Sequence, residues 1–426
     1  MRKLKIGVVG AGSTYTPELI DGFIKRQKEM NVKEFALMDI NEERLKIVGG
    51  LIRRMCDQFT NPPKVTFTTN LDKAVTDADY MVTQFRVGGL AARAKDEKIP
   101  LGYDIIGQET TGPGGFAKAL RTIPEALKVA KSMELHAPKA CLVNFTNPSG
   151  IVTEAISKYS SVKVIGLCNA PITTRNRIAE VMEVAPDEVY IDSFGLNHLG
   201  WIRGITINGE DKTQELFKKI MESPRIDYML GYKFNRKYIK ALNLLPTGYL
   251  QYYYNNREVL KKLQSLEKTR AQIIMDIDKE LLLQYSDPNL KVKPVGIEKR
   301  GGAWYSEAAV ALINSIENNK KEIHIINVRN NGAIAGIDDD AIVEVPVVVG
   351  SAILKPLVVG KIPDSVAGLI KHVKAYESLT VKAGAEGLKD VAFTALVNHP
   401  FITSIDEAEK MFEELLAANK DYIHLT

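Results

Sequence analysis

The sequence predicts an α/β protein in which a doubly wound parallel sheet is followed by a mixed α+β domain. Two observations carry this prediction. Strand-like apolar segments alternate with amphipathic helical segments up to about residue 170, and the first strand ends in a glycine-rich turn that leads directly into a helix. A length of 426 residues is also too great for one ordinary core. We therefore expect a Rossmann-type domain at residues 1–170 and a second domain at 171–426, packed tightly together because no linker composition separates them.

The first half contains six strand-like segments, and their separation by helical segments is typical of parallel βαβ units. The expected strands are Ile6–Val9, Lys33–Asp39, Val65–Phe67, Tyr80–Phe85, Ala140–Phe145 and Val162–Leu167. The expected helices begin at Thr16, Asn41, Leu71, about Phe116 and Ile151. The glycine-rich segment that follows Arg86 has little periodicity, so we expect a loop there.

The second half has a different pattern. Val189–Ser193 and Ile202–Ile207 predict antiparallel strands, and further strands are expected at Ile323–Val328 and Ala341–Val349. One long charged helix is expected from Glu258 to Tyr285, and the last eighty or so residues are mostly helical in pattern, including amphipathic Ile405–Asn419.

Composition excludes several classes of protein. The net charge is only +4, and basic residues are interspersed with acidic ones, which argues against nucleic acid or an anionic membrane as a partner. No apolar run reaches the roughly 20 residues of a membrane span, and no signal peptide is visible. Three cysteines do not form a disulfide framework, so we expect a cytoplasmic protein.

The first turn has the sequence of a dinucleotide-binding site. Gly10 allows the tight turn, Gly12 has no Cβ to keep phosphates away, and Thr16 followed by Pro17 suits the start of a helix with Thr16 as N-cap. Ser13 and Thr14 belong to the same turn. Tyr15 occupies the place of the third glycine of the fingerprint, so an unliganded turn is the alternative.

Asp39 ends the second predicted strand, where a carboxylate accepts hydrogen bonds from an adenosine ribose and repels a 2′-phosphate. The alternative is a helix cap, but Asn41 already fills that place. We therefore expect NAD rather than NADP.

Four polar clusters follow predicted strands, and ligands of a doubly wound sheet bind at the carboxyl ends of its strands. The clusters contain Arg86, Asn147, Cys168 with Asn169, and His198. Each has a structural alternative: Arg86 could form a surface ion pair, Asn147 could form a turn before proline, and Cys168 could be a buried apolar residue. A Cys168–His198 pair could instead bind a divalent metal and leave positions open for substrate oxygens.

Three further residues are candidates. Tyr249 lies in a segment dense in tyrosines, most of which would be packing residues, and Arg270 and Arg300 could bind phosphate through their guanidinium groups. Arg270 on a charged helix could equally pair with an acid such as Glu267.

Together these segments resemble glycoside hydrolase family 4 over essentially the whole chain. The motifs that carry the resemblance are GAGSTYTPEL, FRVGG, IGQETTGPGGFAKALR, FTNPSG, CNAP, NHLG, LPTGYLQYYY, TRA, RGGAWYSEAA, NNGAI and LVNHP. The resemblance implies a fold like that of lactate and malate dehydrogenases, with an NAD-binding Rossmann domain and a second domain for substrate, metal and oligomerisation. Family members usually form dimers or tetramers, so a homodimer or homotetramer is expected.

The resemblance also implies roles for individual residues. NAD is held by Gly10, Gly12, Ser13, Thr14 and Asp39, and a divalent metal, usually Mn²⁺, is held by Cys168 and His198. Tyr249 corresponds to the catalytic base and Glu109 to an acid that increases its basicity. Arg86, Asn147, Asn169, Arg270 and, more weakly, Arg300 correspond to substrate-binding positions.

The pair Cys168-Asn169 resembles the 6-phospho-β-glucosidases of this family, whereas members acting on α-linked phosphosugars resemble Cys-Asp. An amide cannot act as a general acid, so water would protonate the leaving group. The implied reaction is hydrolysis of a phosphorylated disaccharide or aryl β-glucoside 6-phosphate, such as cellobiose 6-phosphate, to glucose 6-phosphate. It proceeds by oxidation at C3 by NAD, deprotonation at C2, elimination and addition of water.

Three alternatives remain at this level. A family 4 glycosidase could have a different linkage specificity. A 2-hydroxy-acid dehydrogenase has a related fold, but it has no use for Cys168 and lacks its usual motif around His198. A non-catalytic NAD-sensing protein would leave the metal pair and Tyr249 unexplained.

Overall fold

The computed structural model describes residues 1–300 and 304–426, and its largest element is a nine-stranded sheet. Six strands run parallel in the order β3-β2-β1-β4-β5-β6, which is the Rossmann order with its switch point between β1 and β4. Three antiparallel strands, β11 to β13, extend the sheet beyond β6. The predicted Rossmann-type α/β fold is therefore confirmed, and strands from the second half of the chain complete its sheet.

The strands have the following bounds: β1 Lys3–Val9, β2 Asn31–Met38, β3 Lys64–Thr68, β4 Tyr80–Thr83, β5 Cys141–Asn144, β6 Lys163–Gly166, β7 Val189–Leu196, β8 Leu199–Ile207, β9 Glu210–Asp211, β10 Leu245–Pro246, β11 Glu322–Arg329, β12 Ile342–Val349 and β13 Leu354–Pro356. The helices are α1 Thr16–Lys25, α2 Glu42–Cys56, α3 Leu71–Val75, α4 Gly89–Lys98, α5 Pro113–His136, α6 Ser149–Tyr159, α7 Ala170–Met182, α8 Thr213–Glu222, α9 Ile226–Leu230, α10 Arg236–Leu242, α11 Gln251–Tyr254, α12 Asn256–Gln264, α13 Arg270–Tyr285, α14 Tyr305–Glu317, α15 Asp364–Glu386, α16 Lys389–Val397 and α17 Ile405–Ala418.

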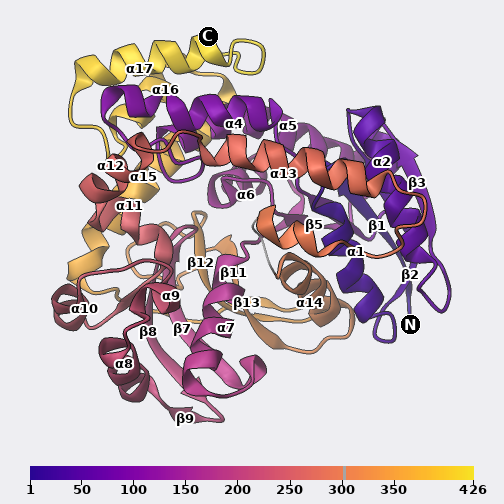
Figure 1. Ribbon diagram of the computed structural model, residues 1–426, viewed down its shortest axis with the longest axis horizontal. Helices are drawn as coiled ribbons and strands as arrows, with labels where there is room; N and C mark the ends of the chain where they lie inside the picture. Colours follow the sequence, from indigo (N-terminus) through magenta and orange to yellow (C-terminus); the bar gives the residue numbers. More distant parts are fainter. Residues whose placement is uncertain (301–303) are drawn as a thin grey trace.

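A smaller antiparallel sheet, β10-β8-β7 with β9 beside β8, holds the substrate side of the molecule. Strand β12 of the large sheet packs against β7, so the two sheets share a core. Figure 1 shows this lobe at the lower left, with α7, α8 and α10 around it, and the N-terminal strands at the right. The antiparallel pair predicted near residues 189–207 is therefore confirmed.

Late helices return over the first domain. Helix α13 lies along α4 and α2, α14 packs against α1, and α15 crosses α5 and α6. In Figure 1, α13 runs across the top of the N-terminal strands, and α16 and α17 lie above it near the C-terminus. The second half of the chain thus covers the edge of the sheet at which a cofactor would bind.

Three local predictions were wrong. Thr16 is the first residue of α1 rather than its N-cap, which is Tyr15, because the Thr16 hydroxyl donates back to the carbonyl oxygens of Ala11 and Ser13 at 2.9 Å. The segment expected to be a loop contains helix α4, and α5 begins at Pro113, before the expected Phe116.

The predicted helix from Glu258 to Tyr285 is two helices, α12 and α13. The chain breaks between them because Thr269 starts α13 with a capping box: its hydroxyl accepts from the backbone of Gln272, and the Gln272 side chain accepts from the Thr269 backbone. None of the helices in the described ranges is both long enough and apolar enough to cross a bilayer.

Candidate active site

The turn after β1 is built by contacts within the chain. Gly10 has φ +88°, and a Cβ there would lie 2.7 Å from the backbone of Phe85 at the end of β4. A Cβ on Gly12 would lie 2.9 Å from the carboxylate of Asp39, which accepts a hydrogen bond from the Gly12 amide at 2.9 Å. The absence of a side chain at Gly12 therefore brings Asp39 onto the turn, a reason that the sequence interpretation, centred on phosphates, missed.

The rest of this turn is tied to helix α13. The hydroxyl of buried Thr14 donates to Asp278 at 2.6 Å, and the hydroxyl of Tyr285 donates to the Thr14 carbonyl at 2.8 Å. Asp278 also accepts from Arg44 at 2.7 Å. Ser13 accepts a weaker bond from the Tyr15 amide at 3.3 Å. A segment more than 250 residues away in sequence thus fixes the shape of the turn.

Cys168, His198 and Tyr249 come together although they lie on three separate segments. Cys168 follows β6 and His198 lies in the tight turn between β7 and β8 with φ +64°, so that Sγ and Nε2 are 3.4 Å apart. The ring of Tyr249 stacks on the imidazole of His198, with centroids 3.9 Å apart and planes 12° from parallel. The structure therefore brings the predicted metal pair and the predicted base into one cluster.

Burial dominates the ionisation of this cluster. It lowers the pKa of His198 to about 3 and raises the pKa of Cys168 to about 12, with Glu344 as the second cause of the latter shift. The pKa of Tyr249 is raised well above its ordinary value by burial, then by Cys168, Tyr252 and Glu109, and Arg93 opposes the shift. A neutral imidazole, a thiol and a phenol therefore face one another at neutral pH.

Glu109 lies in a cluster of three cations. Its carboxylate pairs with Arg86, with Arg93 at 2.9 Å and with Lys118 at 2.8 Å. Burial alone would raise the pKa of Glu109, but the three cations together hold it well below its ordinary value. Burial, followed by the charge of Arg86, lowers the pKa of Lys118 to about 7.

Sequence reasoning named Arg86 and Glu109 but missed Arg93 and Lys118. Lys118 stands within the motif IGQETTGPGGFAKALR, so its place in that motif was the available signal. Arg93 lies on α4, the helix that was predicted to be a loop.

The remaining arginines surround Tyr15. The guanidinium of Arg300 lies 4.3 Å from the centroid of the Tyr15 ring, and the charges of Arg93, Arg270 and Arg86 also lower the pKa of Tyr15, although burial outweighs them and raises it. Arg270 donates to the backbone carbonyls of Lys299 and Arg300 at 3.2 and 3.3 Å. Gly301 and Gly302, the glycines of the predicted Arg300 loop, lie outside the described residues.

Two predicted asparagines lie at neighbouring strand ends. The Oδ1 atom of Asn147 is buried and has no partner among the described residues, while its Nδ2 makes a long contact of 3.4 Å with the Phe145 carbonyl. Asn169 is the N-cap residue of α7, and its Oδ1 lies 4.0 Å from the Cys168 sulfur. An unpartnered buried amide oxygen at this edge suits a ligand that brings its own hydrogen-bond donor.

The donor set at Cys168 and His198 fits a divalent metal. A sulfur and an imidazole nitrogen converge, and within residues 1–300 and 304–426 no cluster of three or more His, Cys, Asp and Glu side chains could complete a closed site. A metal held there would keep several coordination positions for substrate oxygens. The cavity beside this pair is lined in part by His198, Tyr249, Trp201, Thr247 and Glu344.

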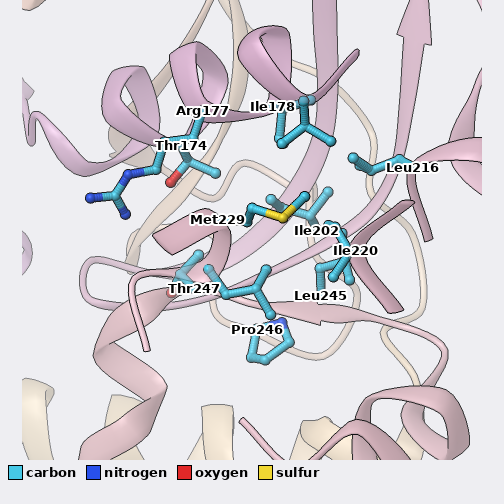
Figure 2. A pocket seen from close by; sticks show the side chains of 12 residues that line it. Thr174, Arg177, Ile178, Ile202, Leu216, Ile220, Met229, Leu245, Pro246 and Thr247 are labelled. Atoms are coloured by element: carbon cyan, nitrogen blue, oxygen red, sulfur yellow. The ribbon is translucent and has the colours of Figure 1, made fainter. Parts of the chain in front are cut away.

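A second cavity belongs to the core of the small lobe. It is lined mainly by apolar side chains of α7, α8, α9, β8 and β10, such as Ile202, Ile220 and Met229. Figure 2 shows the guanidinium of Arg177 pointing away from the cavity centre, so no charged group faces its interior. This cavity lacks the polar groups that would orient a substrate.

A Rossmann sheet whose carboxyl edge holds a thiol–imidazole pair beside a buried phenol defines a dinucleotide-binding fold combined with a metal-capable catalytic site. The chain belongs to glycosyl hydrolase family 4: residues 5–184 match the family 4 glycosyl hydrolase domain, and residues 193–402 match the family's C-terminal domain. The protein is therefore a glycosidase, and the predicted membership of this family is confirmed.

Similar proteins cover the full chain. It is 44% identical to the probable 6-phospho-beta-glucosidase of Bacillus subtilis, over 99% of this chain and 97% of that protein. It is 38% identical to the 6-phospho-beta-glucosidase BglT of Thermotoga maritima, over 99% and 100% of the two chains. The Thermotoga maritima structure solved with manganese, NAD⁺ and glucose-6-phosphate superposes with a TM-score of 0.92 at 36% identity, over 99% and 100% of the chains.

More distant structures define the fold class. Malate dehydrogenase from Plasmodium falciparum has a TM-score of 0.52 at 14% identity, over 92% of this chain and 99% of that one. The predicted likeness to lactate and malate dehydrogenases is therefore confirmed at the level of the fold. Its 2-hydroxy-acid dehydrogenase and NAD-sensing alternatives are set aside by the family membership.

Proposed function

We propose that this glycosidase hydrolyses 6-phospho-β-glucosides, such as cellobiose 6-phosphate, to glucose 6-phosphate, with NAD and a divalent metal, Mn²⁺ first, as cofactors. The observation that carries the proposal is the Cys168–His198–Tyr249 cluster at the carboxyl edge of the Rossmann sheet. The proteins of known name to which the chain is most fully similar include three 6-phospho-beta-glucosidases, which supports the β linkage and the 6-phosphate.

When bound, NAD would supply a reversible hydride acceptor for C3 of the sugar, and the metal would supply positive charge for the oxygens on C2 and C3. The protein residues proposed to hold them are Gly10, Gly12, Ser13, Thr14 and Asp39 for NAD, and Cys168 and His198 for the metal. His198 is suited to this role because burial keeps its imidazole neutral, with a lone pair to donate.

Tyr249 would take the proton from C2 on its phenolic oxygen. Stacking on His198 fixes the ring, so the oxygen has a defined place beside the metal pair. The negative charge of Glu109 raises the pKa of Tyr249 and so its basicity, as the sequence interpretation proposed. Arg86, Arg93 and Lys118 hold that carboxylate ionised.

Two features bear on the substrate. Asn169 beside Cys168 has no proton to give, so water would protonate the leaving group, which agrees with a β-linked substrate in this family. Arg86, Arg270 and Arg300 gather around Tyr15, where their charges would favour a dianionic 6-phosphate. Asn147, with a free buried amide oxygen, would accept from a sugar hydroxyl.

The division at residue 170 into an NAD-binding domain and a substrate, metal and oligomerisation domain remains part of this proposal. So do a cytoplasmic location and a homodimeric or homotetrameric assembly.

The proposal is tested by assaying p-nitrophenyl α- and β-glucosides, each with and without a 6-phosphate, in the presence of NAD, Mn²⁺ and a thiol reductant. We expect turnover of the β-linked phosphate alone. The unphosphorylated β-glucoside should have a kcat/KM lower by orders of magnitude, because each charge-assisted contact to phosphate is worth about 1.5–3 kcal/mol. Equal kcat/KM for the two β-glucosides would contradict the phosphate assignment, and preference for the α-linked phosphate would contradict the linkage.

A further inference from the structure

Glu344 is the one acidic residue of strand β12, IVEVPVVV, and it lies level with the metal pair. It is paired in register with Asn327 of β11, which in turn is paired with Gly166 of β6. Cys168 follows two residues after Gly166. Three strands therefore carry Glu344 to the end of the sheet from which the Cys168 turn leaves.

Two amides from different elements donate to the same carboxylate oxygen of Glu344. The distances are 2.9 Å from Nδ2 of Asn197 and 3.1 Å from Nδ2 of Asn327. Asn327 fits only because Gly166 has no side chain, since a Cβ there would lie 2.8 Å from the Cβ of Asn327. This arrangement is a built site rather than a chance contact.

The contacts of Glu344 reach both proposed metal ligands. Asn197 precedes His198 in the tight turn between β7 and β8, and its side chain also hydrogen-bonds Cys168. Glu344 and His198 line the same cavity. One carboxylate is thus linked through a single asparagine to the turn that carries the imidazole and to the thiol.

The charge of Glu344 has no counter-charge in the described part of the chain. Its interactions are burial and the two asparagine amides, with no lysine, arginine or histidine among them. Burying a carboxylate without a cation is costly, and proteins keep such groups where a cation or a reaction requires them.

We propose that Glu344 is a positioning residue for the metal pair: it holds the Asn197–His198 turn and supplies the negative charge that a divalent cation on Cys168 and His198 would balance. This inference rests on the proposed function, because that function places the cation at Cys168 and His198. Carboxylates behind metal ligands fix ligand orientation and raise metal affinity in this way.

The test is direct measurement of Mn²⁺ affinity on the full chain with NAD bound, by electron paramagnetic resonance of free Mn²⁺. Glu344→Gln keeps the shape and an oxygen acceptor but removes the charge. We expect its Mn²⁺ Kd to rise by about 10- to 100-fold, while its NAD Kd stays unchanged. The matched control is Glu322→Gln on the neighbouring strand β11, a partly exposed glutamate that should bind Mn²⁺ as the wild type does.

A second variant separates position from charge and covers the case in which Glu344→Gln does not fold. Asn197→Ser keeps the Glu344 carboxylate but removes its link to the His198 turn, and its Mn²⁺ Kd should lie between those of the wild type and Glu344→Gln. The thermal midpoint of each metal-free variant shows that it is folded. The rise in midpoint on adding Mn²⁺ should be smaller for both variants than for the wild type.

The outcomes distinguish this inference from the function beneath it. A wild type that binds Mn²⁺, together with a folded Glu344→Gln of unchanged Kd, would overturn the charge role and leave the proposed function standing. Unchanged Mn²⁺ affinity in Asn197→Ser would overturn the positioning role. A wild type with no Mn²⁺ affinity would remove the metal from the proposed function as well.

Discussion

The turn after β1 and the cluster at Cys168 occupy the same edge of the sheet but are built in opposite ways. In the turn, polar side chains are satisfied within the chain: Asp39 accepts from Gly12, Thr14 donates to Asp278, and Thr16 donates to two carbonyls. The cluster instead brings a thiol and an imidazole together beside a phenol, all buried.

This difference follows from what each region must do. A cofactor that stays bound needs a backbone of fixed shape, and hydrogen bonds within the chain provide that shape before any ligand arrives. A metal and a reacting sugar need lone pairs and protons that are not already committed. The pKa shifts of Cys168, His198 and Tyr249 come first from burial and express this lack of charged partners.

The sharpest test of the reactive cluster is Tyr249→Phe, which keeps the ring stacked on His198 and removes its oxygen. We expect kcat to fall by about 10²- to 10⁴-fold, the range of positioned acid–base catalysis, with the Kd for NAD unchanged. Hydrolysis in D₂O by the wild type should place deuterium at C2 of the product, which nuclear magnetic resonance detects.

The matched control is Tyr252→Phe, three residues further along, whose ring centroid lies 6.1 Å from that of Tyr249. It should retain activity within a few-fold. A fully active Tyr249→Phe enzyme, or product without deuterium at C2, would remove this residue from the proton transfer and break the contrast between the two regions.

The cofactor turn was predictable from sequence because its signal is local. A strand, two glycines and a helix start stand within about fifteen residues, and apolar periodicity located all six parallel strands. The contacts that fix the turn were not predictable, because Asp278 and Tyr285 come from a helix far away in sequence.

Helix α4 was missed for a different reason. Its buried face includes Asp96 and Glu97 rather than apolar residues, so hydrophobic periodicity could not reveal it. Asp96 is fully buried because Arg121 of α5 pairs with it. Arg93 escaped notice with the helix, and Glu344 escaped because one acid in an apolar strand has no pattern.

For the cofactor region, Asp278→Asn removes the charge that joins Thr14, Arg44 and Arg300. We expect the free energy of unfolding to fall by about 1.5–3 kcal/mol at pH 7, because hydrogen bonds to a charged group are lost at a site that is 6% exposed. Urea unfolding measures this change. The kcat of the NAD-saturated variant should change far less than that of Tyr249→Phe.

The pH dependence gives a second readout of Asp278. Burial would raise its pKa, but Arg44, Arg300 and Thr14 outweigh burial and lower it. The stability gained from this carboxylate is therefore present above the unfolded-state pKa of about 3.9 and is lost as pH falls through the lower folded-state value. Asp276→Asn, on the exposed face of the same helix, is the control; an acid limb that is the same in both variants and the wild type would contradict the assignment.

The smallest expected effect comes from Thr16→Val, which tests whether the turn is fixed by its own hydrogen bonds. The Thr16 hydroxyl donates to the carbonyls of Ala11 and Ser13 and accepts from Nε2 of Gln84 at 2.7 Å, so it joins the turn to the end of β4. Valine keeps the branched shape, and the loss should be about 1 kcal/mol in unfolding free energy. If the turn is shaped in advance for NAD, the NAD Kd should rise by a similar free energy, about fivefold, measured by calorimetry. Thr394→Val, whose exposed hydroxyl donates to the Asp390 carbonyl, should change neither quantity by as much. A Thr16→Val variant that loses stability but binds NAD as tightly as the wild type would show that the hydroxyl holds the fold without shaping the cofactor site.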